Sequence, residues 1–144
     1  MTIIESLYRY MVDCPVLDEL ATLKIDFLPN LAESCSIEPT PTQAVNQWYI
    51  NGSSEREYQF IIATRFSYSE ESQLTMSNSG FFEHLQDWFE IQTDEGNLPV
   101  LDNGRVATSI EALTTGYLFA QDSDMRDARY QIQCVLRYTQ RKEG

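Results

Sequence analysis

The acidic segment DSDMRD, residues 122–127, holds the side chains most suited to binding a metal ion. Asp122, Asp124 and Asp127 are spaced much as ligands are in a calcium loop. The EF-hand pattern, however, needs an oxygen ligand where Arg126 stands, a glycine where Asp127 stands and a glutamate where Gln133 stands. We therefore expect no metal site. The segment is interpreted as a solvated hairpin tip rich in turn-forming aspartates, with contact to a partner as the alternative.

A single histidine and three cysteines limit the other chemistry that is open to the chain. His84 has no second histidine with which to build a zinc cluster or a histidine pair. Cys14, Cys35 and Cys134 are an odd number without a CxxC pair, and no signal peptide precedes them. We expect no disulfide framework and a reducing compartment. The patterns GxGxxG, Walker, GxSxG and HExxH do not occur in the sequence.

Adjacent carboxylates offer the remaining enzymatic interpretation. Glu70 with Glu71, or Asp94 with Glu95, would be the candidate pair. Neighbouring residues on a polar loop are poorly placed for paired acid-base work. We therefore expect a protein that is not an enzyme and that needs no cofactor.

The charge balance argues against tight binding to nucleic acid. The 144 residues include ten basic and twenty-two acidic side chains, a net charge of −12. Affinity for a phosphate backbone comes mostly from Lys and Arg, so this chain should not bind DNA tightly. Aromatic side chains in the central region are interpreted as sheet core rather than as a stacking platform for single strands, since such platforms come with basic grooves: Trp48, Tyr49, Tyr58, Phe60, Phe66 and Tyr68. No apolar run approaches the roughly 20 residues of a membrane helix, so no membrane contact is expected.

Hydrophobic periodicity predicts two helices. Thr2 and Glu5 have capping-box spacing ahead of apolar residues at helical intervals, which predicts a helix over about residues 2–12. A second helix is expected after Ser79 as its N-cap. Its apolar stripe would lie across the sheet and consists of Phe81, Phe82, Leu85, Trp88 and Phe89, while His84 belongs to its polar face.

Alternation of apolar and polar residues predicts the strands. A modest strand is expected near residues 24–28, and a brief one at 35–38 within a loop that contains two prolines. Residues 44–50 and 56–68 flank the turn sequence NGSSE and should form a hairpin. Strand texture returns from Val100 and is interrupted by Asn103-Gly104, and a last long hairpin should join residues 107–119 with 130–139. Strands around two packing helices indicate one α+β domain, residues 1–144, with a mainly antiparallel sheet.

The order of these segments resembles a known family. The C-terminal segment IEALTTGYLFAQDSDMRDARYQIQCVLRYTQ carries the most specific part, the progression from TGYLF to ARYQIQC to Tyr138. The central hairpin QWYINGSSEREYQFIIATRFSYS and the helix FFEHLQDWFE complete it. Together they resemble the minor capsid or tail-terminator proteins encoded in the head-to-tail module of long-tailed phages and prophages of Gram-positive bacteria.

That resemblance implies a structural virion protein with a tail-terminator-like α+β fold. Such a subunit forms a hexameric ring on the end of the tail tube, stops tube polymerisation and provides the joint to the head connector. Its implied partners are further copies of itself, the major tail tube protein and the connector protein, and it would lie at the tail-neck junction after assembly in the bacterial cytoplasm. DNA would pass through the ring without tight binding. Asp122, Asp124, Arg126 and Asp127 would then contact a partner or line the lumen.

The negative charge leaves a second class of protein open. An acidic cytoplasmic inhibitor, of the immunity or anti-restriction type, would block a basic nucleic-acid site on its target. Such an inhibitor should concentrate its acidic residues on one convex patch, whereas here Asp and Glu are spread from Glu5 to Glu143. The tail terminator is therefore the expected function and the inhibitor its alternative.

Overall fold

A computed structural model describes residues 1–19, 22–25, 28, 34–42, 45–67, 72–121 and 127–141 of the chain. Its elements follow in the order α1 (Ile3–Val12), η1 (Pro15–Glu19), β1 (Thr22–Ile25), β2 (Ser34–Pro39), β3 (Gln47–Trp48), β4 (Ser54–Ser67), α2 (Ser72–Glu95), β5 (Arg105–Ala112), β6 (Tyr117–Gln121) and β7 (Asp127–Gln140).

One seven-stranded sheet organises the described residues. Its strand order is β1-β2-β4-β7-β5, with β3 added to β4 and β6 added to β7. β4 and β7 are each 14 residues long and pair with each other from end to end. Only the pairing of β1 with β2 is parallel among the described strands. The prediction of an α+β fold with a mainly antiparallel sheet is confirmed.

β5 and β6 lie one after the other along the same side of β7. β5 pairs with residues 134–140 of β7 and β6 with residues 128–131. Between them the chain bends, and the backbone N–H groups of Leu113 and Thr114 both donate to the carbonyl oxygen of Gln133. Gly116 in this bend lies so close to α2 that an added β-carbon would fall 2.3 Å from the Phe82 ring. The long hairpin predicted for this part of the chain is present, with a bend in its first arm.

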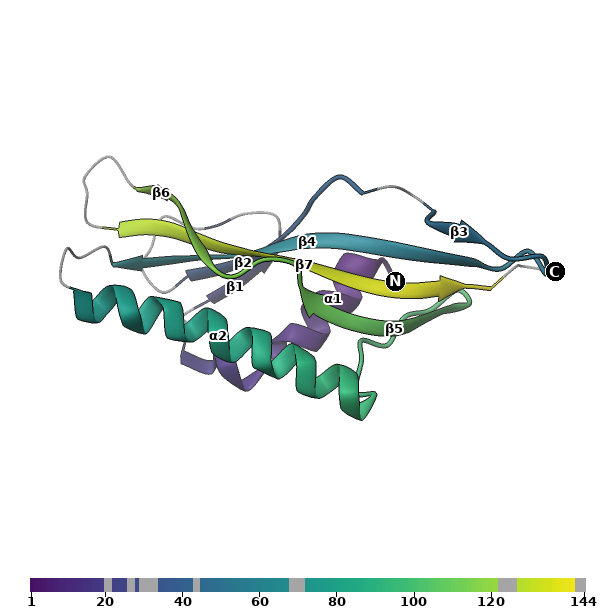
Figure 1. The fold of residues 1–144 in the computed structure, drawn as a ribbon, viewed down its shortest axis with the longest axis horizontal. Coiled ribbons are helices and arrows are strands. Elements are labelled where there is room, and N and C mark those ends of the chain that lie inside the picture. The colour runs from purple at the N-terminus through teal and green to yellow at the C-terminus, as the bar shows by residue number, and fades with distance from the viewer. Residues whose placement is uncertain are drawn as a thin grey trace.

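Both helices cover the same face of the sheet, and the opposite face carries no helix (Figure 1). The core lies between the helices and the sheet. Its large, fully buried side chains include Leu7 and Met11 from α1, Leu85 and Phe89 from α2, and Phe60, Ile62, Ile132 and Leu136 from β4 and β7. The core residues of β4 and β7 are separated by even numbers of residues, because successive side chains of a strand point to opposite faces of the sheet.

The sequence signals for α1 act as expected. The Thr2 hydroxyl oxygen accepts a hydrogen bond from the backbone N–H of Glu5 at 3.3 Å, which caps the first turn. At the other end the Tyr10 ring lies 5.2 Å from the Trp88 ring, measured between centroids. The Tyr10 hydroxyl donates to the carbonyl oxygen of Asn97 at 2.9 Å, so α1 is tied to α2 and to the segment that follows it.

Three expectations about element boundaries are wrong. α2 begins at Ser72, so Ser79 lies inside the helix and does not cap it. Once nucleated, a helix can extend through a polar segment that contains no proline, because each added residue makes a further main-chain hydrogen bond. β3 has only two residues, so the first arm of the central hairpin is much shorter than the predicted 44–50. Val100 precedes β5, because Asn103 and Gly104 take positive φ values of 58° and 76° and form a turn.

Candidate interaction surfaces

The described residues contain no cluster of three or more metal-ligating side chains. His84 is exposed on α2, on the polar face where the sequence placed it. Cys14, Cys35 and Cys134 form no disulfide bond and are buried in the core. Burial raises the pKa of the Cys134 thiol well above its ordinary value, so it is not a reactive thiolate.

The predicted contact loop falls largely outside the described residues. Asp122, Asp124 and Arg126 lie in the segment that the structure does not describe. Asp127 is the first residue of β7, and its backbone pairs with Ser67 of β4. The assignment of this loop as a partner or lumen contact therefore stays a prediction.

The two carboxylate pairs considered for catalysis do not form a site in the described structure. Glu70 and Glu71 lie outside the described residues. Asp94 and Glu95 are exposed at the end of α2, rather than on the polar loop that was expected. Asp94 lines a shallow hollow beside β5, with Glu90 and Glu111. Glu111 is engaged in an ion pair with Arg137 of β7, and no histidine is among the described residues that line the hollow, so the three carboxylates offer no acid paired with a base.

The tip of the β3-β4 hairpin exposes three large apolar side chains in succession. Trp48 is 63% exposed, Tyr49 is 42% exposed and Ile50 is fully exposed. We call these three residues the apolar knob. The hairpin that carries it extends past the end of β5, at the end of the sheet where α2 does not reach (Figure 1). The sequence interpretation of Trp48 and Tyr49 as sheet core is wrong, because both side chains lie on a part of the hairpin that extends past α2 and stay exposed (Figure 1).

Hydrogen bonds hold the apolar knob in one conformation. The Tyr49 N–H donates to the Ser53 carbonyl oxygen at 2.9 Å, and the Gly52 N–H donates to the Tyr49 carbonyl oxygen at 3.0 Å. Gly52 has a positive φ of 88°, which glycine adopts without strain. The Asn51 side chain accepts from the Ser53 N–H at 3.0 Å and from its hydroxyl at 2.6 Å. The turn is therefore ordered by its own residues while its apolar side chains face water.

Charged side chains flank the apolar knob. The Arg56 guanidinium lies 5.8 Å from the centre of the Trp48 ring, in cation-π geometry. The Tyr49 hydroxyl donates to a Glu55 carboxylate oxygen at 2.9 Å, and this hydrogen bond raises the pKa of Tyr49. Tryptophan, tyrosine and arginine are the residues that most often dominate the energetics of protein interfaces. The knob has the composition of a binding surface.

The helix-free face of the sheet carries paired polar side chains. Arg129 on β7 binds Glu38 on β2 at 3.0 Å and donates to Gln131 at 3.1 Å. Gln131 in turn donates to the Tyr117 hydroxyl at 2.7 Å, and Gln133 donates to the same hydroxyl at 3.1 Å. This network crosses β2, β7 and β6. Because its polar groups are hydrogen-bonded to one another, the network stabilises a sheet face that no described helix covers (Figure 1).

A second ion-pair group lies on the same face toward β5. Arg137 on β7 contacts Glu57 on β4 at 3.5 Å and also forms an ion pair with Glu111 on β5. The hydrogen bond to Glu111 raises the pKa of Arg137 further. One guanidinium is thus shared by two carboxylates across three strands, which leaves this group with one net negative charge.

The exposed side of α2 concentrates negative charge. Glu83, Asp87, Glu90 and Asp94 are all exposed and recur at intervals of four, three and four residues. Such spacing aligns side chains along one side of a helix. Within the described structure these four carboxylates form no ion pair. We call them the acidic stripe, and sequence reasoning missed it because acidic residues were judged only by their spread along the chain.

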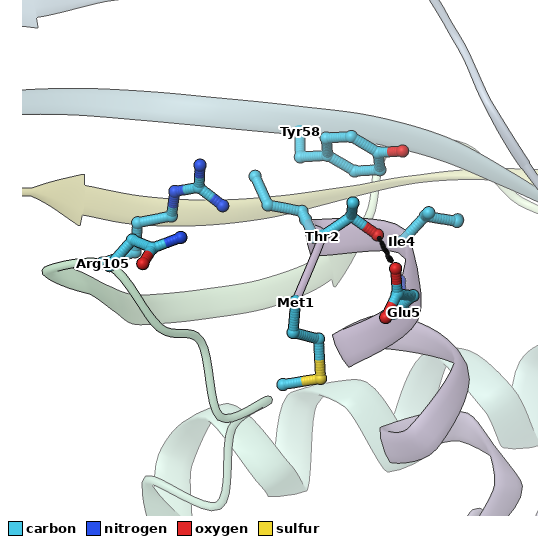
Figure 2. A pocket seen from close by; sticks show the side chains of 8 residues that line it. Met1, Thr2, Ile4, Glu5, Tyr58 and Arg105 are labelled. Carbon is cyan, nitrogen blue, oxygen red and sulfur yellow. Dashed lines mark hydrogen bonds between the residues drawn. The ribbon is translucent and has the colours of Figure 1, made fainter.

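Two hollows adjoin each other where α1 begins. The larger, with a volume of about 540 Å³, lies between the start of α1 and the strands (Figure 2). Tyr58 reaches it from β4 and Arg105 from β5, while the Thr2 hydroxyl donates to a Glu5 carboxylate oxygen at 3.0 Å on the helix side. It is open and combines polar with apolar groups. We call it the Tyr58 hollow.

The second hollow has a volume of about 350 Å³ and lies between α1 and the segment that leads from α2 to β5. Its lining is mainly apolar and includes Tyr10, Leu98 and Val100, the last of which is 80% exposed. Arg9 and Asp13 also line it. We call it the Val100 hollow.

Met1 lines both hollows and fixes their common wall. Its ammonium nitrogen lies 2.9 Å from a carboxylate oxygen of Asp102. The hydrogen bond from this ammonium lowers the pKa of Asp102. The segment between α2 and β5 is thereby tied to the start of α1.

No protein-family model matches this chain, and no curated protein shows significant similarity to it. In the part of the chain that the structure describes, neither helix has the length and apolar character needed to cross a membrane.

Proposed function

We propose that this protein is a tail terminator of a long-tailed phage or prophage. In this proposal it is a structural virion protein that forms a hexameric ring on the end of the tail tube. The ring stops tube polymerisation and provides the joint to the head connector at the tail-neck junction. The observation that carries the proposal is the apolar knob, because a rigid turn that exposes Trp48, Tyr49 and Ile50 suits binding to another protein.

The remaining surface supports an assembly role rather than catalysis. The described residues bring together exposed apolar and charged surfaces but no nucleophile with a base and no metal-ligand cluster. A terminator needs a rigid scaffold and surfaces that select neighbours, and a sheet with two 14-residue strands paired end to end supplies that scaffold. The specific choice of a tail terminator rests on the resemblance of residues 47–69, 81–90 and 110–140 to that family.

Charge is consistent with DNA passing through such a ring. The net charge of −12 per chain gives six copies a formal −72, and the acidic stripe on α2 is not neutralised within the described residues. At physiological ionic strength charges act over about 8 Å, so carboxylates close to a lumen would repel passing DNA. The loop at residues 122–127 remains a proposed contact to the lumen or to a neighbouring protein.

Assembly with the tail tube protein tests this function. The purified chain would be mixed with the major tail tube protein of the same phage or prophage, and tube lengths would be measured by negative-stain microscopy. We expect rings on one end of the tubes and an arrest of tube growth. Loss of the gene should likewise give tails of uncontrolled length that fail to join heads. Tubes that grow equally long with and without the protein, and that do not bind it, would refute the proposal.

The acidic stripe favours one second candidate. A convex row formed by Glu83, Asp87, Glu90 and Asp94 is the arrangement expected of an inhibitor that blocks a basic nucleic-acid site. Such an inhibitor would raise the plating of unmodified phage on a restricting host, and Asp87→Lys with Glu90→Lys would abolish the effect. A terminator would give no protection in this assay and would still arrest tube growth.

A further inference from the structure

The apolar knob and the Val100 hollow are two exposed apolar features of opposite shape on one chain. The knob projects from the hairpin turn, and Ile50 at its tip is fully exposed. The hollow is recessed and mainly apolar, with a volume at the low end of those that bind small ligands, enough for one or two side chains. Neither feature is filled by the described part of its own chain.

The knob cannot reach a hollow of its own chain. Tyr58, on the wall of the Tyr58 hollow, lies four residues along β4 from Ser54, where the turn ends. Four residues of strand span about 14 Å, and the turn points away along the strand axis (Figure 1). The Val100 hollow lies beyond the Tyr58 hollow, on the far side of Met1. A knob that fills it must therefore come from another molecule.

We propose that the knob of one copy inserts into the Val100 hollow of the next copy, and that this contact is the lateral interface of the ring. The inference rests on the proposed function, because it names the surfaces by which that ring closes. Knob and hollow are different surfaces, so the contact is heterologous, and heterologous contacts produce rings when the rotation closes. Contact between two knobs would bury far less of each, since two convex surfaces touch over a small area.

Charged groups around the two surfaces are complementary. Glu55 and Arg56 flank the knob, and Arg9 and Asp13 line the hollow. Arg56 facing Asp13 and Glu55 facing Arg9 would place opposite charges together at the rim. Like charges would face each other if the knob were turned around, so the rim charges select one orientation.

The area of this contact indicates a weak association. The exposed parts of one tryptophan, one tyrosine and one isoleucine amount to on the order of 400 Å². Even with an equal area from the hollow, the total lies below the roughly 1,200 Å² that stable complexes bury. The free protein should therefore be a monomer or a weak oligomer, and rings should close only at high concentration or on the end of a tube.

Crosslinking between two single-cysteine variants tests the contact. One variant carries Ile50→Cys and the other Val100→Cys, and a short bismaleimide is added because it does not need β-carbons within about 4 Å as a disulfide does. The native cysteines are buried and should not react in the folded protein. We expect covalent dimers from the mixture but not from either variant alone. Ile91→Cys, at an exposed isoleucine on α2, replaces Ile50→Cys in the control and should give no dimer.

A second measurement uses assembly instead of crosslinking. Ile50→Asp should raise the concentration at which rings form at least about tenfold, as expected for an interface hot spot, whereas Ile91→Asp should leave it unchanged. Circular dichroism would confirm that both variants remain folded.

The outcomes separate the inference from the proposed function. If rings form but no crosslink joins positions 50 and 100, the lateral contact lies elsewhere and only the inference fails. If Ile50→Asp abolishes binding to the tube while rings persist, the knob contacts tube protein and the inference again fails. If neither rings nor tube binding occur with the unaltered protein, both the inference and the proposed function are refuted.

Discussion

Gly116 gives a sharp test of how α2 packs on the bend between β5 and β6. A β-carbon added at residue 116 would lie 2.3, 2.4 and 2.5 Å from the Cγ, Cδ2 and Cβ atoms of Phe82. Positive-φ glycines in the described structure are at positions 52, 96 and 104, so the backbone at Gly116 accepts alanine. The cost of Gly116→Ala is therefore steric. Phe82 is buried and cannot swing into water, so α2 or the bend must shift.

The expected loss of stability in Gly116→Ala follows from the cost of overpacking a filled site. Inserting a methyl group into a filled site destabilises proteins by about 1–3 kcal/mol. For a chain of this length each kcal/mol lowers the melting temperature by about 3 °C, so Gly116→Ala should melt about 3–9 °C below the unaltered protein. Differential scanning calorimetry and urea unfolding would give the shift and the free energy of unfolding.

Gly80 provides a matched control within the chain. It lies inside α2, and an added β-carbon there would meet nothing within 4 Å. Gly80→Ala should stabilise the protein by about 0.5–1 kcal/mol, because alanine is the better helix former. The same chemical change thus has opposite signs at the two positions.

A double mutant that includes Phe82→Ala tests whether the clash with Phe82 causes this loss of stability. Phe82→Ala removes the Cγ and Cδ2 atoms but keeps the Cβ atom, so adding Gly116→Ala should still destabilise the protein but cost less than it does in the unaltered protein, with a coupling of about 0.5–3 kcal/mol. If Gly116→Ala is neutral or stabilising, or if its cost is unchanged without the Phe82 ring, the described packing of α2 against the bend is wrong.

Two further predictions concern the edge of the sheet and the buried thiols. The Thr93 hydroxyl accepts from the Ile110 N–H at 3.1 Å and donates to its carbonyl oxygen at 2.7 Å, so Thr93→Val should lower the free energy of unfolding by about 1–2 kcal/mol in urea titrations. Thr93→Ser should keep most of the stability, and a Val variant as stable as the unaltered protein would contradict this role. Burial raises the pKa of Cys35 and Cys134 well above the usual range, whereas the same thiols ionise near pH 8.5 in the unfolded chain. The stability that these protonated thiols contribute is therefore complete below that pH and is lost as the pH rises. Above about pH 9 the free energy of unfolding should fall by roughly 1.4 kcal/mol per pH unit for each thiol. Cys134→Ala should remove the part of this pH dependence that comes from one thiol. A free energy of unfolding that stays constant from about pH 8 to 10 would contradict the burial of the thiols.

Local signals in the sequence predicted the elements whose residues pack on one face. The cap at Thr2, the apolar stripe that includes Phe82 and Phe89, and the alternation along β7 depend on spacings of a few residues and are confirmed. The first turns of α2 could not be predicted in this way, because residues 72–79 carry no apolar stripe and read as a loop.

The surfaces were harder to predict than the core. An apolar run such as Trp48 to Ile50 has the same composition whether it is buried or exposed, and only the two-residue length of β3 decides the outcome. The ion pair between Glu38 and Arg129 joins residues 91 positions apart, so the pairing order of the strands had to be known first. The acidic stripe, by contrast, was readable in advance from the spacing of Glu83, Asp87, Glu90 and Asp94.

The central place of β7 in the sheet has a consequence for how the chain reaches its fold during synthesis. β4, β5 and β6 all pair with β7, yet β7 follows every one of them in the sequence. The long edge of β4 must therefore wait unpaired while some 60 further residues are made, since Ser67 ends β4 and Asp127 begins its partner. An unpaired edge of that length is a template for aggregation, and pairing over such separations is slow. Nascent chains should thus depend on chaperones until residue 140 leaves the ribosome, and slowing translation should lower the yield of folded protein rather than raise it.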